Sequence, residues 1–337
     1  MNEPRLTVSP APHWHTGIRI STSSVALLLA LCLPALNGIL VFGSAALKLI
    51  FIAVATAVVV ESLMRVLLKR PIMGVDLISA VVLGLVFALF LPAGAPWWLV
   101  VLGVVVAAII GRQLYGGVGG HPFHPAMVGL VVLILSYPSL LSEFPAPDPV
   151  WKAGFLGWTE AGLDIFPLGA IKDMGLEDFT GYLEMYENPR KMFLFGNVAG
   201  PIGQVGLLAI LIGGVLLCLT RHIRWLIPVS VLVTVAVLGA VFHAVNPEVN
   251  PAWYWHILSG SVLLIAFFVA TDPTTSPVNT IPIILFGVGI GLLTIIIRVY
   301  GSYIDGGPFA VLLMNLLMPL LDRIRRPAYG KKVKAYA

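Results

Sequence analysis

Long apolar segments alternate with short polar ones along most of the chain. Ten segments are apolar enough to cross the hydrocarbon core of a bilayer, which takes about twenty residues of helix. They are expected at 24–42, 47–67, 77–91, 97–110, 125–141, 201–219, 225–245, 255–270, 281–297 and 309–321. Several are short, which is typical of tilted, broken or re-entrant helices. The pattern predicts an all-α integral membrane protein with about ten transmembrane helices.

The junctions before the last segments of the two halves resemble each other. Tyr115-Gly-Gly and Tyr300-Gly-Ser each open a glycine-containing stretch that ends in Pro-Phe, at 122–123 and at 308–309. Because each half holds five segments, an odd number, a related second half would be inserted upside down. We therefore expect two five-helix inverted repeats. The alternative is chance similarity between two loops rich in glycine and proline.

This pattern divides the chain into five parts. They are a cytoplasmic N-terminal segment (1–23), a first membrane repeat (24–141), an extracytoplasmic loop (142–195), a second membrane repeat (196–322) and a basic cytoplasmic tail (323–337). The two cysteines, Cys32 and Cys218, lie inside apolar segments, so neither a disulfide framework nor a cysteine metal site is expected.

Composition narrows the class further. With 58% apolar and 11% charged residues, the chain lacks the polar shell of a soluble enzyme, a nucleic-acid binder or a disordered scaffold. Fourteen of the twenty basic residues fall on the side of both termini, whereas the loop 142–195 carries nine acids and four bases. The positive-inside rule then predicts that both termini are cytoplasmic. The basic tail is expected to meet the membrane surface or a partner protein, not nucleic acid.

Tryptophans mark several predicted span ends. Trp97, Trp98, Trp225, Trp253 and Trp255 are expected to form an aromatic belt at the membrane interfaces.

Two irregular stretches carry candidate chemistry. After four glycines the chain reads His121-Pro-Phe-His124-Pro, and a second stretch, Thr271-Asp272-Pro, follows the eighth segment on the same predicted side. Irregular backbone at membrane depth is tolerated where it lines a protein cavity. The first stretch is open to three interpretations, a loop turn, a cofactor contact or a metal site. The prolines disfavour a metal site, because they break the helix that would align both histidines.

Four separated motifs occur in a fixed order along the chain. They are Arg112-Gln-Leu-Tyr-Gly-Gly continuing to Pro122-Phe-His-Pro-Ala-Met, Phe195-Gly-Asn with Gly200 and Gly203, Leu258-Ser-Gly continuing to Thr271-Asp-Pro, and Asp305-Gly continuing to Asn315. Together they resemble the RnfD family of the Rnf complexes, which is related to the NqrB family of the sodium-pumping NADH:quinone reductases. The resemblance extends from about residue 20 to the end.

The resemblance implies a membrane subunit of an ion-translocating ferredoxin:NAD oxidoreductase in the inner membrane of a bacterium. Such a complex couples electron transfer through flavins and iron–sulfur clusters to the movement of Na⁺ or H⁺. The expected partners are the other Rnf subunits and the lipid bilayer, with ferredoxin and NAD reached indirectly. Activity is expected only within the complex.

The resemblance also implies two flavins. In the family, FMN is esterified through its phosphate to a threonine that is followed by Pro-Leu, but here the sequence is Asp164-Ile-Phe166-Pro-Leu. Because Phe166 has no hydroxyl, we expect FMN to be held reversibly, packed between Phe166 and the Gly196-Asn197 turn. Backbone amides of residues 196–203 are then expected to meet its phosphate.

The second flavin of the family is a riboflavin held without a covalent bond. It is placed near two asparagines, and both positions are histidine here, His121 and His124. Histidine can still donate to, or accept from, the edge of an isoalloxazine ring. Asp272, in the second irregular stretch, is the expected partner of this site.

Three carboxylates are candidates for ion coupling, because charges inside a membrane are costly and usually functional. The resemblance implies this role for Glu61 and Asp305, and Asp76 is added by its position at the start of the third segment. The alternatives are that Glu61 reaches the interface and that Asp76 only caps its helix. A different class of function also stays open, since an inverted repeat alone would suit a redox-free channel or carrier.

Overall fold

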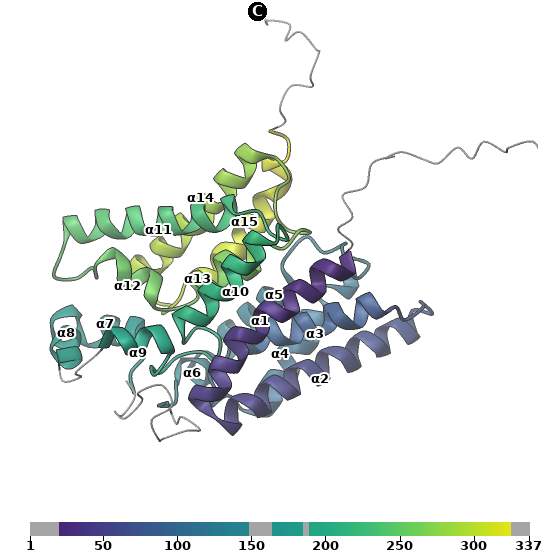
Figure 1. The fold of residues 1–337 in the computed structure, drawn as a ribbon, viewed down its shortest axis with the longest axis horizontal. Helices are drawn as coiled ribbons and strands as arrows, with labels where there is room; N and C mark the ends of the chain where they lie inside the picture. The colour runs from purple at the N-terminus through teal and green to yellow at the C-terminus, as the bar shows by residue number, and fades with distance from the viewer. Residues whose placement is uncertain (1–19, 148–163, 185–188, 325–337) are drawn as a thin grey trace, which may run out of the picture.

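The structure, a computed structural model, describes residues 20–147, 164–184 and 189–324 (Figure 1). Within these ranges the protein is helical, and the extended backbone includes one isolated antiparallel bridge between Pro92 and Pro201. The helices form two groups, one on each side of the polar connection.

The first group contains five longer helices and two short ones, drawn from purple to blue in Figure 1. They are α1 (Ile20–Phe42), α2 (Ser44–Leu67), α3 (Gly74–Leu89), α4 (Trp97–Ile109) and α5 (Pro125–Ser136), with the 3-10 turn η1 (Gln113–Tyr115) and α6 (Pro138–Ser142). Helix α2 packs on α3 and α4, α1 packs on α3, and α4 packs on α5.

The second group, drawn from green to yellow, follows the polar connection and contains one broken helix. It contains α10 (Leu207–Leu219), α11 (Leu226–Val245), α12 (Trp253–Leu258), α13 (Val262–Leu264), the π-helix η2 (Ile265–Val269), α14 (Thr280–Tyr300) and α15 (Gly307–Leu321). Helix α11 packs on α12 and α14, and α14 packs on α15.

The two groups meet through corresponding helices. Helix α1 packs on α10, the first helix of each group, and α5 packs on α15, the last of each group. The first contact is close because α10 presents a glycine there. A Cβ atom on Gly213 would lie 2.7 Å from the carbonyl oxygen of Ala30. Small residues that let helix backbones approach are a common means of packing helices in lipid.

The lengths and the exposed faces of the helices fit a bilayer. Helices α1, α2, α11 and α14, together with the run Trp97–Tyr115, are long and apolar enough to cross it, and α3, α5, α10 and α15 are shorter apolar helices. Large apolar side chains face outward, such as Phe51 (71% exposed) and Leu219 (78%). Such faces are stable in hydrocarbon and not in water. The predicted class, an all-helical membrane protein, is confirmed.

Three predicted segments differ from the observed helices. The fifth, expected at 125–141, is divided at Tyr137 into α5 and α6. The sixth was expected from residue 201, but α10 begins at Leu207. The backbone before it is extended, with Ile202 N donating to Leu91 O (2.9 Å) and Gly203 N to Leu89 O (2.8 Å). The eighth was expected as one helix but breaks between α12 and α13, at Gly260. This residue has a φ of +80°, which glycine adopts without strain.

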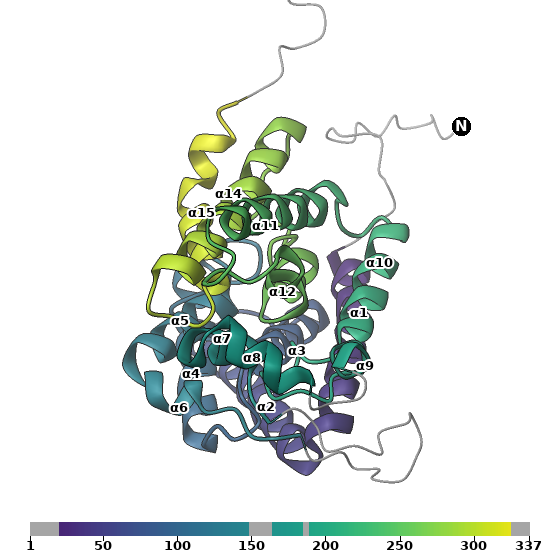
Figure 2. The same cartoon turned by 90° about the vertical axis from the view of Figure 1, so that its left-hand side faces the viewer.

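The described residues of the polar connection, 164–184 and 189–195, form three short helices that lie together near α12 (Figure 2). These are α7 (Pro167–Met174), α8 (Leu176–Glu184) and α9 (Pro189–Phe195). They share a small core with Trp255, whose ring meets those of Phe179 and Phe193 edge to face at 5.4 and 5.3 Å. The placement of Trp255 in the aromatic belt was therefore wrong, because this side chain is only 9% exposed.

Candidate functional site

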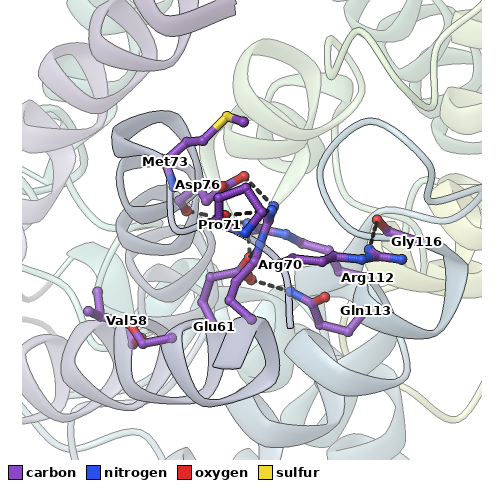
Figure 3. A network of polar contacts seen from close by, with 11 residues as sticks. Val58, Glu61, Arg70, Pro71, Met73, Asp76, Arg112, Gln113 and Gly116 are labelled. Carbon is purple, nitrogen blue, oxygen red and sulfur yellow. Dashed lines mark hydrogen bonds and ion pairs between the residues drawn. The ribbon is translucent and has the colours of Figure 1, made fainter. Parts of the chain in front are cut away.

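Glu61 is the centre of a buried network in the first group (Figure 3). Its side chain is 1% exposed. Oε1 accepts a hydrogen bond from Arg65 Nε at 3.1 Å, and Oε2 accepts from Gln113 Nε2 at 2.5 Å and lies 3.2 Å from Arg112 Nη2. Glu61 thus joins α2 to the end of α4 and to η1. The side chain is therefore enclosed by protein and does not extend to solvent.

Asp76 belongs to the same network from the first turn of α3. Its Oδ1 pairs with Arg65, and its Oδ2 accepts from Met73 N at 3.1 Å, so the carboxylate caps the helix and also forms an ion pair. Arg112 Nη2 lies 3.4 Å from the carbonyl oxygen of Asp76. Two of the three expected ion-coupling carboxylates therefore share Arg65, and Arg112 links the Glu61 carboxylate to the main chain at Asp76.

Asp305 occupies a similar position in the second group. Its Oδ1 accepts from Arg298 Nη2 at 2.9 Å, and its Oδ2 accepts from Ser261 N at 2.8 Å. Arg298 is 3% exposed and also donates to the carbonyls of His256 (2.6 Å) and Ser259 (3.4 Å). These donors and acceptors satisfy the backbone groups freed on both sides of the break at Gly260.

The charge on Asp305 is favoured by its partner. Burial alone would raise the pKa of this carboxyl, but the Arg298 guanidinium and the hydrogen bond from the Ser261 amide hold it below its usual value. A carboxylate kept ionised in this way stays paired with Arg298 at neutral pH.

The structure brings the two irregular stretches together. His121 Nε2 lies 3.3 Å from Asp272 Oδ2 and 2.5 Å from Thr274 Oγ1. The hydroxyls of Thr274 and Thr275 both donate to Asp272 Oδ2, Thr275 at 3.2 Å. Burial disfavours the Asp272 charge, but the hydrogen bond from His121 and the nearby histidines outweigh it and hold the pKa of Asp272 at about 2.

His124 lies beside this pair at the start of α5. It lines a pocket of about 70 Å³ together with Arg112, His121 and Asp272. Burial lowers the pKa of His124 to about 4 against the opposing effect of Asp272, so the imidazole is neutral. The pocket is far below the roughly 300 Å³ at which small-molecule sites begin. The described residues of this chain therefore do not enclose riboflavin there, although the site can hold a few water molecules.

Phe166, the N-cap residue of α7, borders a much larger cavity. This cavity measures about 270 Å³, and its lining includes Phe90, Phe144, Gln204 and Tyr303. The rings of Phe144 and Phe166 lie 4.6 Å apart. The volume approaches that of small-molecule sites, and the aromatic walls fit the ring system of a flavin.

Three of the backbone amides that were expected to meet the flavin phosphate already donate to other backbone groups. Gly196 N and Asn197 N both donate to Met192 O, at 2.7 and 2.9 Å, and Gly203 N donates to Leu89 O. The space between Phe166 and Gly196 measures about 20 Å³, which is room for one water molecule. The larger space therefore lies on the Phe144 side of Phe166, and not between Phe166 and the 196–197 turn.

Sequence reasoning did not select the residues that hold the carboxylates in place, Arg65, Arg112, Gln113 and Arg298. One signal was present. Arg112 and Arg298 each stand two or three residues before the Tyr-Gly pair that opens the repeated junction. Gln204 and Tyr303 had no such signal, because only the fold brings them to Phe166.

The fold and these networks define a multi-pass membrane protein with charged groups buried among its helices. In membrane proteins such groups mark pathways for ions or protons.

Sequence comparison identifies the family. Residues 7–330 match the NQR2, RnfD, RnfE family, and the chain belongs to it. Similar proteins, each named as the D subunit of an ion-translocating oxidoreductase complex, occur in Stutzerimonas stutzeri (37% identical, 94% of each chain covered) and Halorhodospira halophila (35%, covering 95% of this chain and 94% of that one). The relative from Yersinia pseudotuberculosis serotype O:1b is 36% identical, covering 97% of this chain and 99% of its own. The resemblance drawn from the four motifs is confirmed.

Proposed function

We propose that this chain serves as the RnfD component of an ion-translocating oxidoreductase complex, and that it couples flavin-mediated electron transfer to the movement of Na⁺ or H⁺. The observation that carries the proposal is family membership over nearly the whole chain, with relatives of that name covered almost end to end. The other subunits of such a complex are its partners. Ferredoxin and NAD react on those subunits.

In this proposal the chain crosses the inner membrane of a bacterium ten times, as two inverted five-helix repeats with both termini in the cytoplasm. The pairing of first helix with first and last with last supports the symmetry. The distribution of basic residues supports the orientation. The network around Glu61 then lies toward the cytoplasm, and the Arg298–Asp305 pair lies toward the opposite side.

The carboxylates have different roles in moving an ion. Glu61, Asp76 and Asp305 each pair with an arginine, which stays protonated, so a cation must displace a guanidinium to reach them. Asp272 instead pairs with His121 and two hydroxyls. A proton or a small cation can exchange there without breaking an arginine pair.

The flavin belongs to the cavity beside Phe166, where its ring would be held by aromatic side chains and Gln204. When bound, a flavin supplies transfer of one or two electrons. The residues of this chain position the ring and keep water from it. At the other site, His121 and Asp272 hold a proton between them.

The test is the whole complex reconstituted in proteoliposomes, with ferredoxin-dependent reduction of NAD and ion uptake recorded together. Asp272→Asn is expected to abolish ion uptake and slow turnover, while the exposed substitution Lys48→Gln leaves both unchanged. If the chain were a redox-free channel or carrier, it would move ions without electron transfer. Liposomes holding this chain alone would pass Na⁺ or H⁺ with no electron donor present, and that result would reject the proposal.

A further inference from the structure

The cavity beside Phe166 has fixed aromatic walls. Phe144 lies against Phe166, and the ring of Tyr303 lies 4.7 Å from that of Phe309 at an angle of 31°. Rings packed against one another in this way do not collapse into the space beside them. The cavity therefore offers a preformed slot for a planar aromatic molecule.

One polar group in the lining lacks a partner. Gln204 Oε1 is buried and has no hydrogen bond to any described residue. Leaving this oxygen without a partner costs free energy, which is recovered when the amide turns into the cavity and pairs with a ligand. The isoalloxazine ring carries an N–H beside a carbonyl on one edge, and this pair matches a side-chain amide in either orientation of the amide.

The electrostatics of the cavity oppose a phosphate. Its described lining contains no lysine or arginine, and it contains the Asp305 carboxylate. The nearby Lys172 Nζ donates to the carbonyls of Gly301 and Tyr303, at 2.9 and 2.6 Å. A dianionic phosphate would lose water here without gaining a positive partner.

We propose that this cavity binds a flavin that carries no phosphate, riboflavin, reversibly, with Gln204 paired to the polar edge of its ring. The inference rests on the proposed function, which brings a flavin to this chain. It also gives a reason for Phe166. Where the family resemblance implies a threonine esterified through the phosphate of FMN, this chain has a phenyl ring without a hydroxyl, and the described lining offers no lysine or arginine to that phosphate.

The experiment uses the full-length chain in detergent, titrated separately with riboflavin and with FMN while the quenching of flavin fluorescence is followed. Riboflavin is expected to bind at least tenfold more tightly than FMN. Gln204→Leu is expected to weaken riboflavin binding at least tenfold, and Gln204→Asn to weaken it less. Thermal unfolding of each variant separates lost binding from lost folding.

A second variant tests the charge argument. Ser302→Arg places a cation in the cavity lining and is expected to raise FMN affinity at least tenfold. The matched change Ser44→Arg, at an exposed site at the start of α2, should leave both affinities unchanged. FMN bound as tightly as riboflavin, no binding of either flavin, or riboflavin binding unaffected in folded Gln204→Leu would each overturn the proposal. A complex that moves no ions while riboflavin still binds would instead reject the proposed function and leave this site standing.

Discussion

The pair formed by Glu61 and Arg112 should be strongly coupled, because both side chains are buried and each holds the other in place. Arg112 is 2% exposed, and besides Glu61 its acceptor is the Asp76 carbonyl at 3.4 Å. Glu61→Gln therefore removes the carboxylate that is paired directly with this buried guanidinium. Removing one member of a buried pair costs about 3–5 kcal/mol of unfolding free energy.

Removing the arginine instead of the glutamate should cost less unfolding free energy. In Arg112→Met, Glu61 keeps Arg65 at 3.1 Å and Gln113 at 2.5 Å, so the carboxylate stays paired. The loss is then close to that of a charged hydrogen bond, about 1–3 kcal/mol. In the double variant the uncompensated guanidinium is gone. The unfolding free energy lost in the double variant should be smaller than the sum of the losses in the two single variants by at least about 2 kcal/mol.

The free energies are measured by unfolding in mixed detergent micelles, followed through the fluorescence of the eight tryptophans. Lys48→Met, at an exposed position of the same helix α2, serves as the control and should stay within about 0.5 kcal/mol of the unchanged protein. A Glu61→Gln variant that loses less than about 1 kcal/mol, or single effects that simply add, would refute the reasoning about this pair.

Three further predictions address other parts of the molecule. The pKa of His124 is about 4 when folded and about 6.5 when unfolded, so the unfolded state binds more protons in this interval and this imidazole contributes about 2 kcal/mol to the loss of stability from pH 7 to pH 5. Thermal unfolding of His124→Asn should show a loss that is smaller by this amount, and an equal loss in the variant would contradict the assignment. Phe166→Thr alone should not yield covalent FMN when the attaching enzyme is present, because Ile165 also departs from the small residue of the family motif, whereas Ile165→Ala with Phe166→Thr should do better. Fluorescent flavin on the single variant in a denaturing gel is the contrary result. Cysteines introduced at Glu184 and Lys334 should label from opposite sides of sealed vesicles, and labelling of both from one side would reject the proposed orientation.

Hydropathy alone was sufficient to predict the class of protein and the approximate positions of its helices. A helix in lipid must present apolar side chains around most of its surface for many residues, so the signal is local and strong. The predicted segments 97–110, 225–245 and 281–297 agree with α4, α11 and α14 to within three residues at each end. The four motifs also identified the family, since they needed no contact to be recognised.

The break after α12 shows where this local signal ends. Residues 255–270 are apolar on both sides of Gly260, and hydropathy therefore predicts one continuous helix. The fold instead stops α12 at Leu258, because Arg298 and Asp305 provide partners for the backbone groups that the break leaves free. Those partners lie more than forty positions along the chain.

Charge pairing and cavity formation were decided only by the tertiary structure. Glu61 and Gln113 are 52 residues apart, and His121 and Asp272 are 151 apart. The sequence determined that charged residues occur within or beside the apolar segments and that Phe166 stands where the family resemblance implies a threonine. Which cation neutralises each carboxylate, and on which side of Phe166 space remains, depend on how distant helices approach one another. The reason is physical, since hydropathy belongs to each segment by itself, whereas an ion pair or a cavity belongs to the space between segments.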